Sequence, residues 1–417
     1  MTGHGRPTGQ RLHICDVVQE WLPGQLNGIA RLIHARATGL AERGHTVRVL
    51  TRSSEAHRVD LEDGVWIHRV PTRQHVRPAG LTLPQGLWNH SASILDELRA
   101  IETSRAVDVV DVPNWDVEGL ATILDGSFVT VLGLYTSLAS YVAVDARFAE
   151  HDPTVRDVLD AERLCYERAD AFLAASTAIV DEVEQAFGLS LPRDRLGLVP
   201  HGLPDVDRFE PCSRRADGSL DVLFVGRLEP RKGIDTFLDA LPLIAGAVPH
   251  SRFTIVGDDA IVAPSGRTFR EDFEKSEVGG RMAHVVEFAG VVDEEELAHR
   301  YAACDVFVAP SRFESFGLIL VEAMRAGKPV VACDASGMRE VIGDSGAGVL
   351  IPPGDRDALA RAVIDLLRDA ARRRSVGAAG RRRFEERFTR ERMIDGVEAF
   401  LDRLVDGTKT VRPGATT

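Results

Sequence analysis

One short stretch of this sequence carries two cations that could bind an anion together. It reads VGRLEPRKG over residues 225–233, where Gly226 lets the chain turn and Arg227 and Lys232 supply the positive charges. Such side chains stabilise a diphosphate, above all when the diphosphate is a leaving group. A solvated loop whose cations bind nothing accounts for the same residues equally well, so the stretch alone does not define a site.

A second stretch places two glutamates around the start of a predicted helix. It reads PSRFESFGLILVEAM over residues 310–324, with Glu314 before the helix and Glu322 one to two turns inside it. Backbone N–H groups at a helix start bind anions and hydroxyl oxygens, and Gly317 allows a ligand close to the backbone. Carboxylates accept hydrogen bonds from the vicinal hydroxyls of sugars and ribose. Alternatively, Glu314 only complements the helix dipole and Glu322 lies on the surface.

For the two stretches to form one site, the strands before them must place them side by side. Along the whole chain, short apolar runs that predict strands alternate with helical patterns. In the first half we predict strands at 12–18, 46–51, 65–70, 107–112, 128–132, 171–175 and 195–199. In the second half we predict strands at 221–225, 252–256, 284–288, 305–309, 329–333 and 348–351. Most are β-branched, apolar on both faces and bounded by Gly, Pro or Asp, which is typical of buried parallel strands. Amphipathic patterns such as residues 29–43 predict the intervening helices.

This alternation predicts an α/β fold with two doubly wound, parallel-sheet domains, in which ligands bind outside the carboxyl ends of the strands. The length of 417 residues fits two domains. A polar stretch between residues 204 and 220 is the expected linker. We predict a first domain over residues 1–205, a second over 206–390, and a C-terminal helix and tail over 391–417 that can pack back on the first domain.

The composition of the chain restricts which partners it could bind and where in the cell it is expected. The net charge of −13 argues against nucleic acid, and we interpret the basic runs at 372–374 and 381–383 as solvated helix faces. No apolar run of about 18 residues occurs, so we expect at most a peripheral association with membranes. The five cysteines are scattered without metal-binding spacing, which favours a cytoplasmic protein.

The two stretches, in this order, resemble the retaining glycosyltransferases of family 4, which have the GT-B fold of two Rossmann-like domains facing a central cleft. The resemblance is carried by GRxxxxKG at 226–233 and ExxxxxxxE at 314–322. It continues through AGKPVV at 326–331 and ASGMREVI at 335–342. It covers nearly the whole chain and is strongest over residues 221–351.

The resemblance implies a role for each matching residue. Arg227 and Lys232 would hold the donor diphosphate, and Glu314 would contact the transferred sugar near its 3-hydroxyl. Glu322 would bind the ribose hydroxyls. Because the departing diphosphate needs charge stabilisation, we expect Arg227, Lys232 and Glu314 to be the catalytic residues. The expected donor-binding residues are Gly28, Gly226, Arg227, Lys232, Gly257, Glu314, Ser315, Phe316, Gly317, Leu318 and Glu322.

Two positions depart from the family pattern. Family members usually have Gly-Gly in the first loop, where this chain has Asn27-Gly28, and Asn tolerates left-handed geometry. Family members often place a histidine near the reacting sugar, where this chain has Leu132. A neighbouring residue such as Tyr135 or Thr136 could take its role.

No metal or cofactor is implied by the resemblance or by the residues. Asp258 and Asp259 follow a predicted strand, and we interpret them as loop carboxylates and not as metal ligands. We therefore expect a metal-independent protein.

Acceptor recognition is expected mainly from the loops of the first domain. The stretch DVPNWDVE at 111–118 offers an aromatic ring among carboxylates, which suits a saccharide, an aminocyclitol or another natural product. A core position for Trp115 and a purely structural hydrogen bond for His201 fit the sequence as well. The expected acceptor-binding residues are Asn114, Trp115, Tyr135 and His201.

The expected function is retaining transfer of a hexose or N-acetylhexosamine from a nucleotide-diphosphate sugar to an acceptor hydroxyl, with UDP-sugars favoured because they are commonest in the family. The family implies a same-face displacement in which the leaving phosphate oxygen accepts the acceptor's proton. Two alternatives stay open: a catalytically silent nucleotide-sugar-binding protein, which Leu132 supports, and an epimerase or hydrolase on the same fold, for which no acid–base pair is evident. A dinucleotide oxidoreductase lacks its Gly-x-Gly-x-x-Gly turn.

Overall fold

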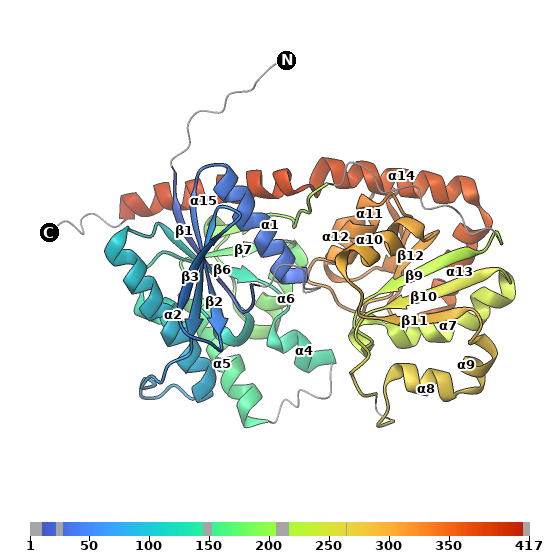
Figure 1. Ribbon diagram of the computed structural model, residues 1–417, viewed down its shortest axis with the longest axis horizontal. Coiled ribbons are helices and arrows are strands. Elements are labelled where there is room, and N and C mark those ends of the chain that lie inside the picture. The colour runs from blue at the N-terminus through green and yellow to red at the C-terminus, as the bar shows by residue number, and fades with distance from the viewer. Residues whose placement is uncertain (1–10, 22–27, 145–151, 206–216, 264, 412–417) are drawn as a thin grey trace, which may run out of the picture. The chain divides into compact units, whose positions relative to one another are not determined.

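The computed structural model describes residues 11–21, 28–144, 152–205, 217–263 and 265–411 (Figure 1). Its contacts divide the chain into two compact units. The N-terminal unit consists of Met1–Pro23, Ile29–Pro200 and Arg390–Thr417, and the C-terminal unit of Gly24–Gly28 and His201–Thr389. Each unit is built on its own β-sheet, as the alternation of strands and helices predicts.

An eight-stranded sheet in the order β3-β4-β2-β1-β5-β6-β7-β8 forms the centre of the N-terminal unit. Its strands are β1 His13–Val18, β2 Thr46–Ser53, β3 Arg58–Glu62, β4 Val65–Pro71, β5 Val109–Pro113, β6 Thr130–Leu134, β7 Ala171–Ala174 and β8 Leu196–Leu198. All neighbours pair in parallel except β3 and β4. Side chains of β1, β5 and β6 are buried on both faces, which explains why these strands are mostly apolar.

The edge strand β3 is absent from the strands predicted from the sequence. Its side chains alternate between charged and apolar and are mostly exposed, so it lacks the apolar run of its neighbours. A positive-φ turn at Asp63 and Gly64 joins it to β4, with φ of 48° and 80°. Asp-Gly between two strands is a strong hairpin signal that could have revealed β3.

Helices cover both faces of this sheet, and the last helix of the chain joins the same unit. They are α1 Gly28–Glu42, α2 Gln85–Ser104, α3 Leu120–Asp125, α4 Leu138–Val144, α5 Pro153–Arg168, α6 Thr177–Phe187 and α15 Arg390–Val411, with short 3-10 turns at Trp115–Val117 and Arg193–Arg195. The helix predicted at 29–43 is thus present. Helix α15 packs closely, because a Cβ added to Gly197 of β8 would lie 2.7 Å from the Phe400 ring.

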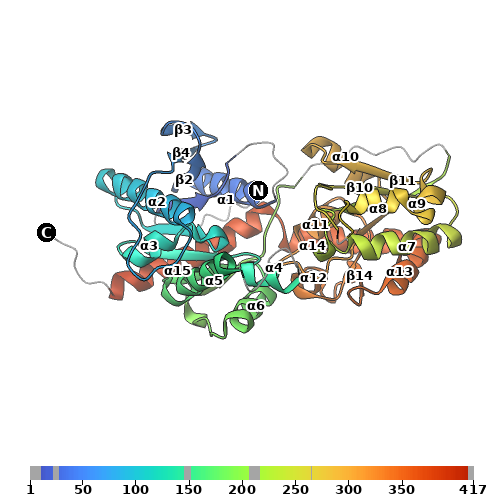
Figure 2. The same cartoon turned by 90° about the horizontal axis from the view of Figure 1, so that it is seen from below.

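The C-terminal unit has a six-stranded, fully parallel sheet in the order β11-β10-β9-β12-β13-β14. Its strands are β9 Leu220–Val225, β10 Ser251–Val256, β11 Val286–Gly290, β12 Val306–Ala309, β13 Val330–Cys333 and β14 Gly348–Ile351. Its helices are α7 Ile234–Ala247, α8 Phe269–Lys275, α9 Glu277–Met282, α10 Glu294–Ala303, α11 Leu318–Arg325, α12 Ser336–Ile342, α13 Arg356–Arg368 and α14 Ala370–Arg387, and Pro230–Lys232 forms a 3-10 turn. Helices α7 and α13 lie side by side (Figure 2).

The strand order of the C-terminal unit locates its ligand site. From the central strand β9 the chain proceeds to β10 on one side, and it returns to β12 on the other side. The order therefore reverses between β9 and β12. In open parallel sheets, ligands bind outside the carboxyl ends of the strands at such a reversal.

Candidate functional site

The two stretches singled out in the sequence leave the carboxyl ends of β9 and β12. These strands are direct neighbours, with Phe224 beside Val308. Residues 81 positions apart consequently meet, and the backbone N–H of Arg312 donates to the carbonyl oxygen of Arg231 at 2.8 Å. The strand reversal and the candidate residues thus coincide.

A buried ion pair lies at the meeting point of the two stretches. Lys232 Nζ donates to Glu314 Oε1 at 2.6 Å, and Ser311 Oγ donates to the same oxygen at 2.8 Å. Glu314 Oε2 lies 3.9 Å from an Arg231 guanidinium nitrogen. Glu314 is therefore held by contacts in the fold, beyond any complement to the helix dipole.

A second buried carboxylate, Glu229, connects two arginines of the first stretch. Its Oε1 lies 2.7 Å from Arg231 and 3.1 Å from Arg227. The side chains of Arg231 and Glu229 are buried, whereas that of Arg227 is 43% exposed. Arg227 is thus anchored at its guanidinium while it remains accessible to a ligand. We call Arg227, Glu229, Arg231, Lys232 and Glu314 the β9–β12 charge cluster.

Burial and neighbouring charges both shift the pKa values in this cluster. Burial lowers the pKa of Lys232, and Arg231 and Arg227 lower it further, although Glu314 acts against them. Burial alone would raise the pKa of Glu314, but Lys232 and Arg231 outweigh burial and hold it below its ordinary value. Three cations thus face two carboxylates, and an anionic ligand would stabilise the whole cluster.

Glycines allow the loops around the charge cluster to touch backbone to backbone. Gly233 has a φ of 70°, and a Cβ there would lie 2.0 Å from the carbonyl oxygen of Pro310. A Cβ on Gly257 would lie 2.0 Å from the carbonyl oxygen of Gly226. No side chain fits at either position, so these glycines are required for the loop geometry whether or not they contact a ligand.

Helix α11 begins at Leu318, four residues after Glu314. Gly317 is its N-cap with a φ of 101°, and no side chain caps the first N–H groups, which begin with that of Leu318. The backbone of Ser315 leads into this turn, and the Phe316 ring is buried against His201 with 5.0 Å between ring centroids. The predicted backbone contacts therefore share one turn with Glu314, and the His201 ring belongs to the same region of the unit.

Glu322 lies inside helix α11 and is only 2% exposed. The alternative of a surface position for this residue is therefore wrong. The hydroxyl of Tyr301 on α10 donates to Glu322 Oε2 at 2.8 Å, and Tyr301 is itself buried. Sequence reasoning missed Tyr301, because a tyrosine in an amphipathic helix usually indicates core packing alone.

The expected acceptor residues of the N-terminal unit are largely buried. Asn114 donates to the carbonyl oxygen of Tyr135 and to the hydroxyl of Tyr166, and it accepts from the Tyr135 N–H. Its amide thus joins the ends of β5 and β6. Trp115 is half-buried against Tyr141, with ring centroids 5.6 Å apart. Acceptor contacts by these residues stay a prediction.

Leu132, at the position where the resemblance leads one to expect a histidine, is fully buried in the middle of β6. A side chain there faces the core of the unit. Tyr135 follows the end of the strand and is 6% exposed, and burial raises the pKa of its phenol to about 12. Gly28 begins α1 and is grouped with the C-terminal unit, whereas Asn27 lies outside the described residues.

A second charged group lies buried inside the N-terminal unit, and the sequence analysis missed it. Arg36 of α1 lies 3.3 Å from an oxygen of Asp16 on β1 and 3.2 Å from Asp111 on β5. All three side chains are nearly inaccessible. Burial raises the pKa of Asp16 to about 6, although Arg36 acts against this shift. This trio joins α1 to the centre of the sheet.

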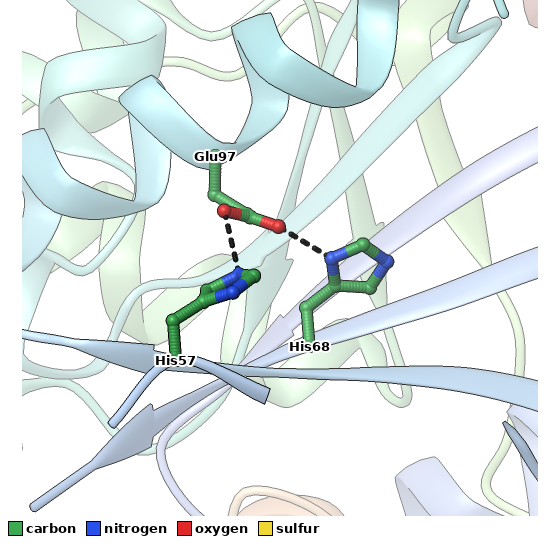
Figure 3. A group of neighbouring side chains, drawn as sticks. All are labelled: His57, His68 and Glu97. Atoms are coloured by element: carbon green, nitrogen blue, oxygen red, sulfur yellow. Dashed lines mark hydrogen bonds and ion pairs between the residues drawn. The ribbon is translucent and has the colours of Figure 1, made fainter. Parts of the chain in front are cut away.

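In the part of the chain that the structure describes, one group of histidine, cysteine or acidic side chains has metal-like spacing. Glu97 of α2 lies 3.0 Å from His57 Nε2 and 2.5 Å from His68 Nδ1 (Figure 3). However, Arg48 lies 2.8 Å from His68 Nε2. A guanidinium only donates hydrogen bonds, so Nε2 is the bare nitrogen and Nδ1 carries the proton.

This arrangement opposes a metal at the His57–His68–Glu97 group. A metal on His68 Nδ1 would move the ring proton to Nε2, where it would face the Arg48 donor. Metal-binding histidines normally direct that second nitrogen at an acceptor. The contacts favour a hydrogen-bonded cluster, and the metal independence of the protein stays a prediction.

No helix among the described residues is long and apolar enough to cross a membrane. The finding agrees with the absence of long apolar runs in the sequence.

Both halves of the chain match known glycosyltransferase families. Residues 206–383 match the family described as glycosyl transferases group 1, and residues 26–206 match glycosyltransferase family 4. A D-inositol 3-phosphate glycosyltransferase from Geodermatophilus obscurus is 31% identical, over 86% of this chain and 81% of the relative.

Solved structures of glycosyltransferases share the fold. Sucrose-phosphate synthase from Thermosynechococcus elongatus has a TM-score of 0.71 at 22% identity, over 96% of this chain and 99% of that one. HepE from Anabaena, solved with UDP and glucose, has a TM-score of 0.67 at 19% identity, over 94% and 99%. At these identities the likeness shows the fold alone, which is GT-B as expected. Together with the family matches, it identifies the chain as a member of glycosyltransferase family 4 and as an enzyme of the glycosyltransferase class.

Proposed function

We propose that this enzyme transfers a hexose or N-acetylhexosamine from a UDP-sugar to a hydroxyl of a saccharide, an aminocyclitol or another natural product, with retention of configuration. The β9–β12 charge cluster is the observation that carries the proposal. It combines excess positive charge, an accessible Arg227 and a carboxylate, Glu314, beside the first turn of a helix. A diphosphate with an attached sugar matches each of these features.

The uridine base of the donor is proposed from a neighbour that shares the fold. The fold neighbour HepE was solved with UDP and glucose, which favours a uridine donor. The Tyr301 hydroxyl holds one oxygen of Glu322, and in this proposal the carboxylate accepts from the vicinal hydroxyls of the ribose. Glu314 of the charge cluster and Glu322 both follow the carboxyl end of β12. A ribose bound at Glu322 would therefore place the attached diphosphate toward the charge cluster.

The proposed reaction needs no group outside the two substrates and this chain. The bond between the sugar C1 and the β-phosphate oxygen breaks, and the acceptor oxygen forms the new bond to C1 on the same face. The acceptor's proton passes to the departing phosphate oxygen. Arg227 and Lys232 stabilise the negative charge that develops on the diphosphate.

Replacing Lys232 tests this proposal. We expect Lys232→Ala to reduce kcat about 100- to 1,000-fold, the usual cost of removing one preorganised charge-stabilising donor. Lys275→Ala, on the exposed end of α8, removes the same charge outside the site and should leave kcat unchanged. Unchanged turnover in Lys232→Ala, with the fold intact by circular dichroism, would contradict the proposed role.

A catalytically silent nucleotide-sugar-binding protein is the second candidate. It is favoured by Leu132, whose buried side chain supplies no polar group at the position where the family often has a histidine. The intact charge cluster supports turnover, so we place this candidate second. Such a protein would bind UDP-sugars and release no nucleotide with any acceptor.

A further inference from the structure

Lys232 and Glu314 are bonded to each other, yet the proposed ligand would need both. Lys232 Nζ lies 2.6 Å from Glu314 Oε1, and the two side chains are 15% and 10% exposed. A phosphate oxygen that binds Lys232 therefore comes within a few ångströms of the Glu314 carboxylate. Two anions at that separation repel each other strongly in a partly buried site.

The strength of this repulsion depends on what the terminal phosphate carries. A free terminal phosphate has a charge of about −1.5 to −2 at pH 7, with a second pKa near 6. Attachment of a sugar removes that second ionisation, because the ester oxygen cannot be deprotonated. The sugar also brings hydroxyl groups that can donate to Glu314, whose Oε2 lies 3.9 Å from Arg231, beyond hydrogen-bond distance.

We propose that Glu314 is a specificity-determining residue that makes the site prefer a sugar-bearing nucleoside diphosphate over the bare nucleoside diphosphate. This inference rests on the proposed function. Glu314 repels the extra charge of the bare diphosphate and competes with it for Lys232. It accepts a hydrogen bond from the sugar in the intact donor. The same residue therefore favours binding of the substrate and release of the product.

A neighbouring carboxylate in the cluster provides a matched control. Glu229 is 1% exposed, and its carboxylate pairs with Arg227 and Arg231, whereas the Lys232 ammonium pairs with Glu314. Removing its charge makes the cluster more positive by the same amount. It removes no group that competes for Lys232 or that could accept from a sugar.

The test measures the affinities of UDP and UDP-glucose, and of GDP and GDP-mannose, by calorimetry at pH 8 for the wild type, Glu314→Gln and Glu229→Gln. Glu314→Gln should bind the bare nucleotide about ten-fold tighter and the nucleotide sugar about ten-fold weaker. Glu229→Gln should change the affinities for the bare nucleotide and for the nucleotide sugar in the same direction. Shifts of the same sign in Glu314→Gln would overturn the inference, because they would reduce its role to general charge.

A measurement on the wild type keeps the inference testable if Glu314→Gln does not fold. Between pH 5.5 and 8 the terminal phosphate of the bare nucleotide ionises. The preference for the nucleotide sugar should grow at least several-fold over this range, and bare UDP that binds tighter as it ionises would overturn the inference. A wild type that binds none of the four ligands would instead remove the proposed donor site, and the inference with it.

Discussion

The two units use buried charge in opposite ways. In the β9–β12 charge cluster of the C-terminal unit, Arg227 remains 43% exposed and the cations outnumber the carboxylates. In the N-terminal unit, Arg36 is enclosed between Asp16 and Asp111, and all three are nearly inaccessible. In the proposed function a ligand completes the first arrangement, whereas the fold itself completes the second. Accessibility and excess charge therefore separate a binding cluster from a structural one.

The largest effect should come from breaking the structural cluster. Arg36→Met leaves two buried carboxylates without their cation and should lower the free energy of unfolding by about 3–5 kcal/mol. Arg227→Met should change it by less than about 1 kcal/mol, because the side chain is half exposed and Glu229 keeps Arg231. Urea denaturation measures both variants, and equal losses would erase the distinction between the two clusters.

The pH dependence of stability should come from a buried acid of the N-terminal unit. Burial, with Glu182 and Asp116 nearby, raises the pKa of Glu162 from 4.5 to about 8. Between these pH values the folded protein holds a proton that the unfolded chain has released. The stabilisation that this bound proton gives the folded protein is complete below pH 4.5. As the pH rises to 8 it is lost, and the free energy of unfolding falls by up to about 1.4 kcal/mol per pH unit.

Glu162→Gln removes this titration and keeps the shape of the side chain. The variant should gain stability relative to the wild type as the pH rises from 5 to 8, in urea denaturation at several pH values. Glu167→Gln, on the exposed face of the same helix α5, serves as the control and should follow the wild type. Parallel stability curves for Glu162→Gln and the wild type would mean that Glu162 is ionised in the folded protein.

The smallest expected effect sharpens the comparison within the C-terminal unit. Tyr301→Phe removes the hydroxyl that donates to Glu322 and should weaken UDP binding about five-fold, less than the full value of one hydrogen bond to a charged group, because the hydroxyl acts on UDP only through Glu322. The loss should shrink for 2′-deoxy-UDP if Glu322 binds the ribose. Tyr166→Phe removes a buried hydroxyl bonded to Asn114 and should leave UDP affinity unchanged. Equal losses for UDP and 2′-deoxy-UDP would make Tyr301 merely structural.

The comparison also shows how far sequence reasoning reaches. Lys232 and Glu314 were predictable because each stands in a local pattern at the end of an apolar strand, and parallel strands bring such ends together. The trio of Arg36, Asp16 and Asp111 was not predictable, because Arg36 and Asp16 are isolated charges inside helix and strand patterns. Asp111 was interpreted as part of the acceptor stretch at 111–118, whereas it pairs with Arg36 in the structure. Their partnership follows from the register in which Asp16 pairs with Asp111.

Some other features were missed for two different reasons. One of them had a local sequence signal that could have been used, and the others had none. The strand β3 could have been found from its Asp-Gly turn to β4. Glu229 and Arg231 stand inside the recognised stretch, but their burial depends on the loop from β12 that packs over them. The resemblance identifies Leu132 as a departure, and only the structure shows that its side chain faces the core.

The most direct test of the account is nucleotide release from a panel of UDP-, GDP- and ADP-sugars, with and without a pool of saccharide and cyclitol acceptors. We predict release of UDP from a UDP-sugar that depends on an acceptor and that Lys232→Ala slows about 100- to 1,000-fold. Release at the same rate without any acceptor would identify a hydrolase. Binding of the donor without release under every acceptor would contradict the proposed transfer and favour the silent binding protein.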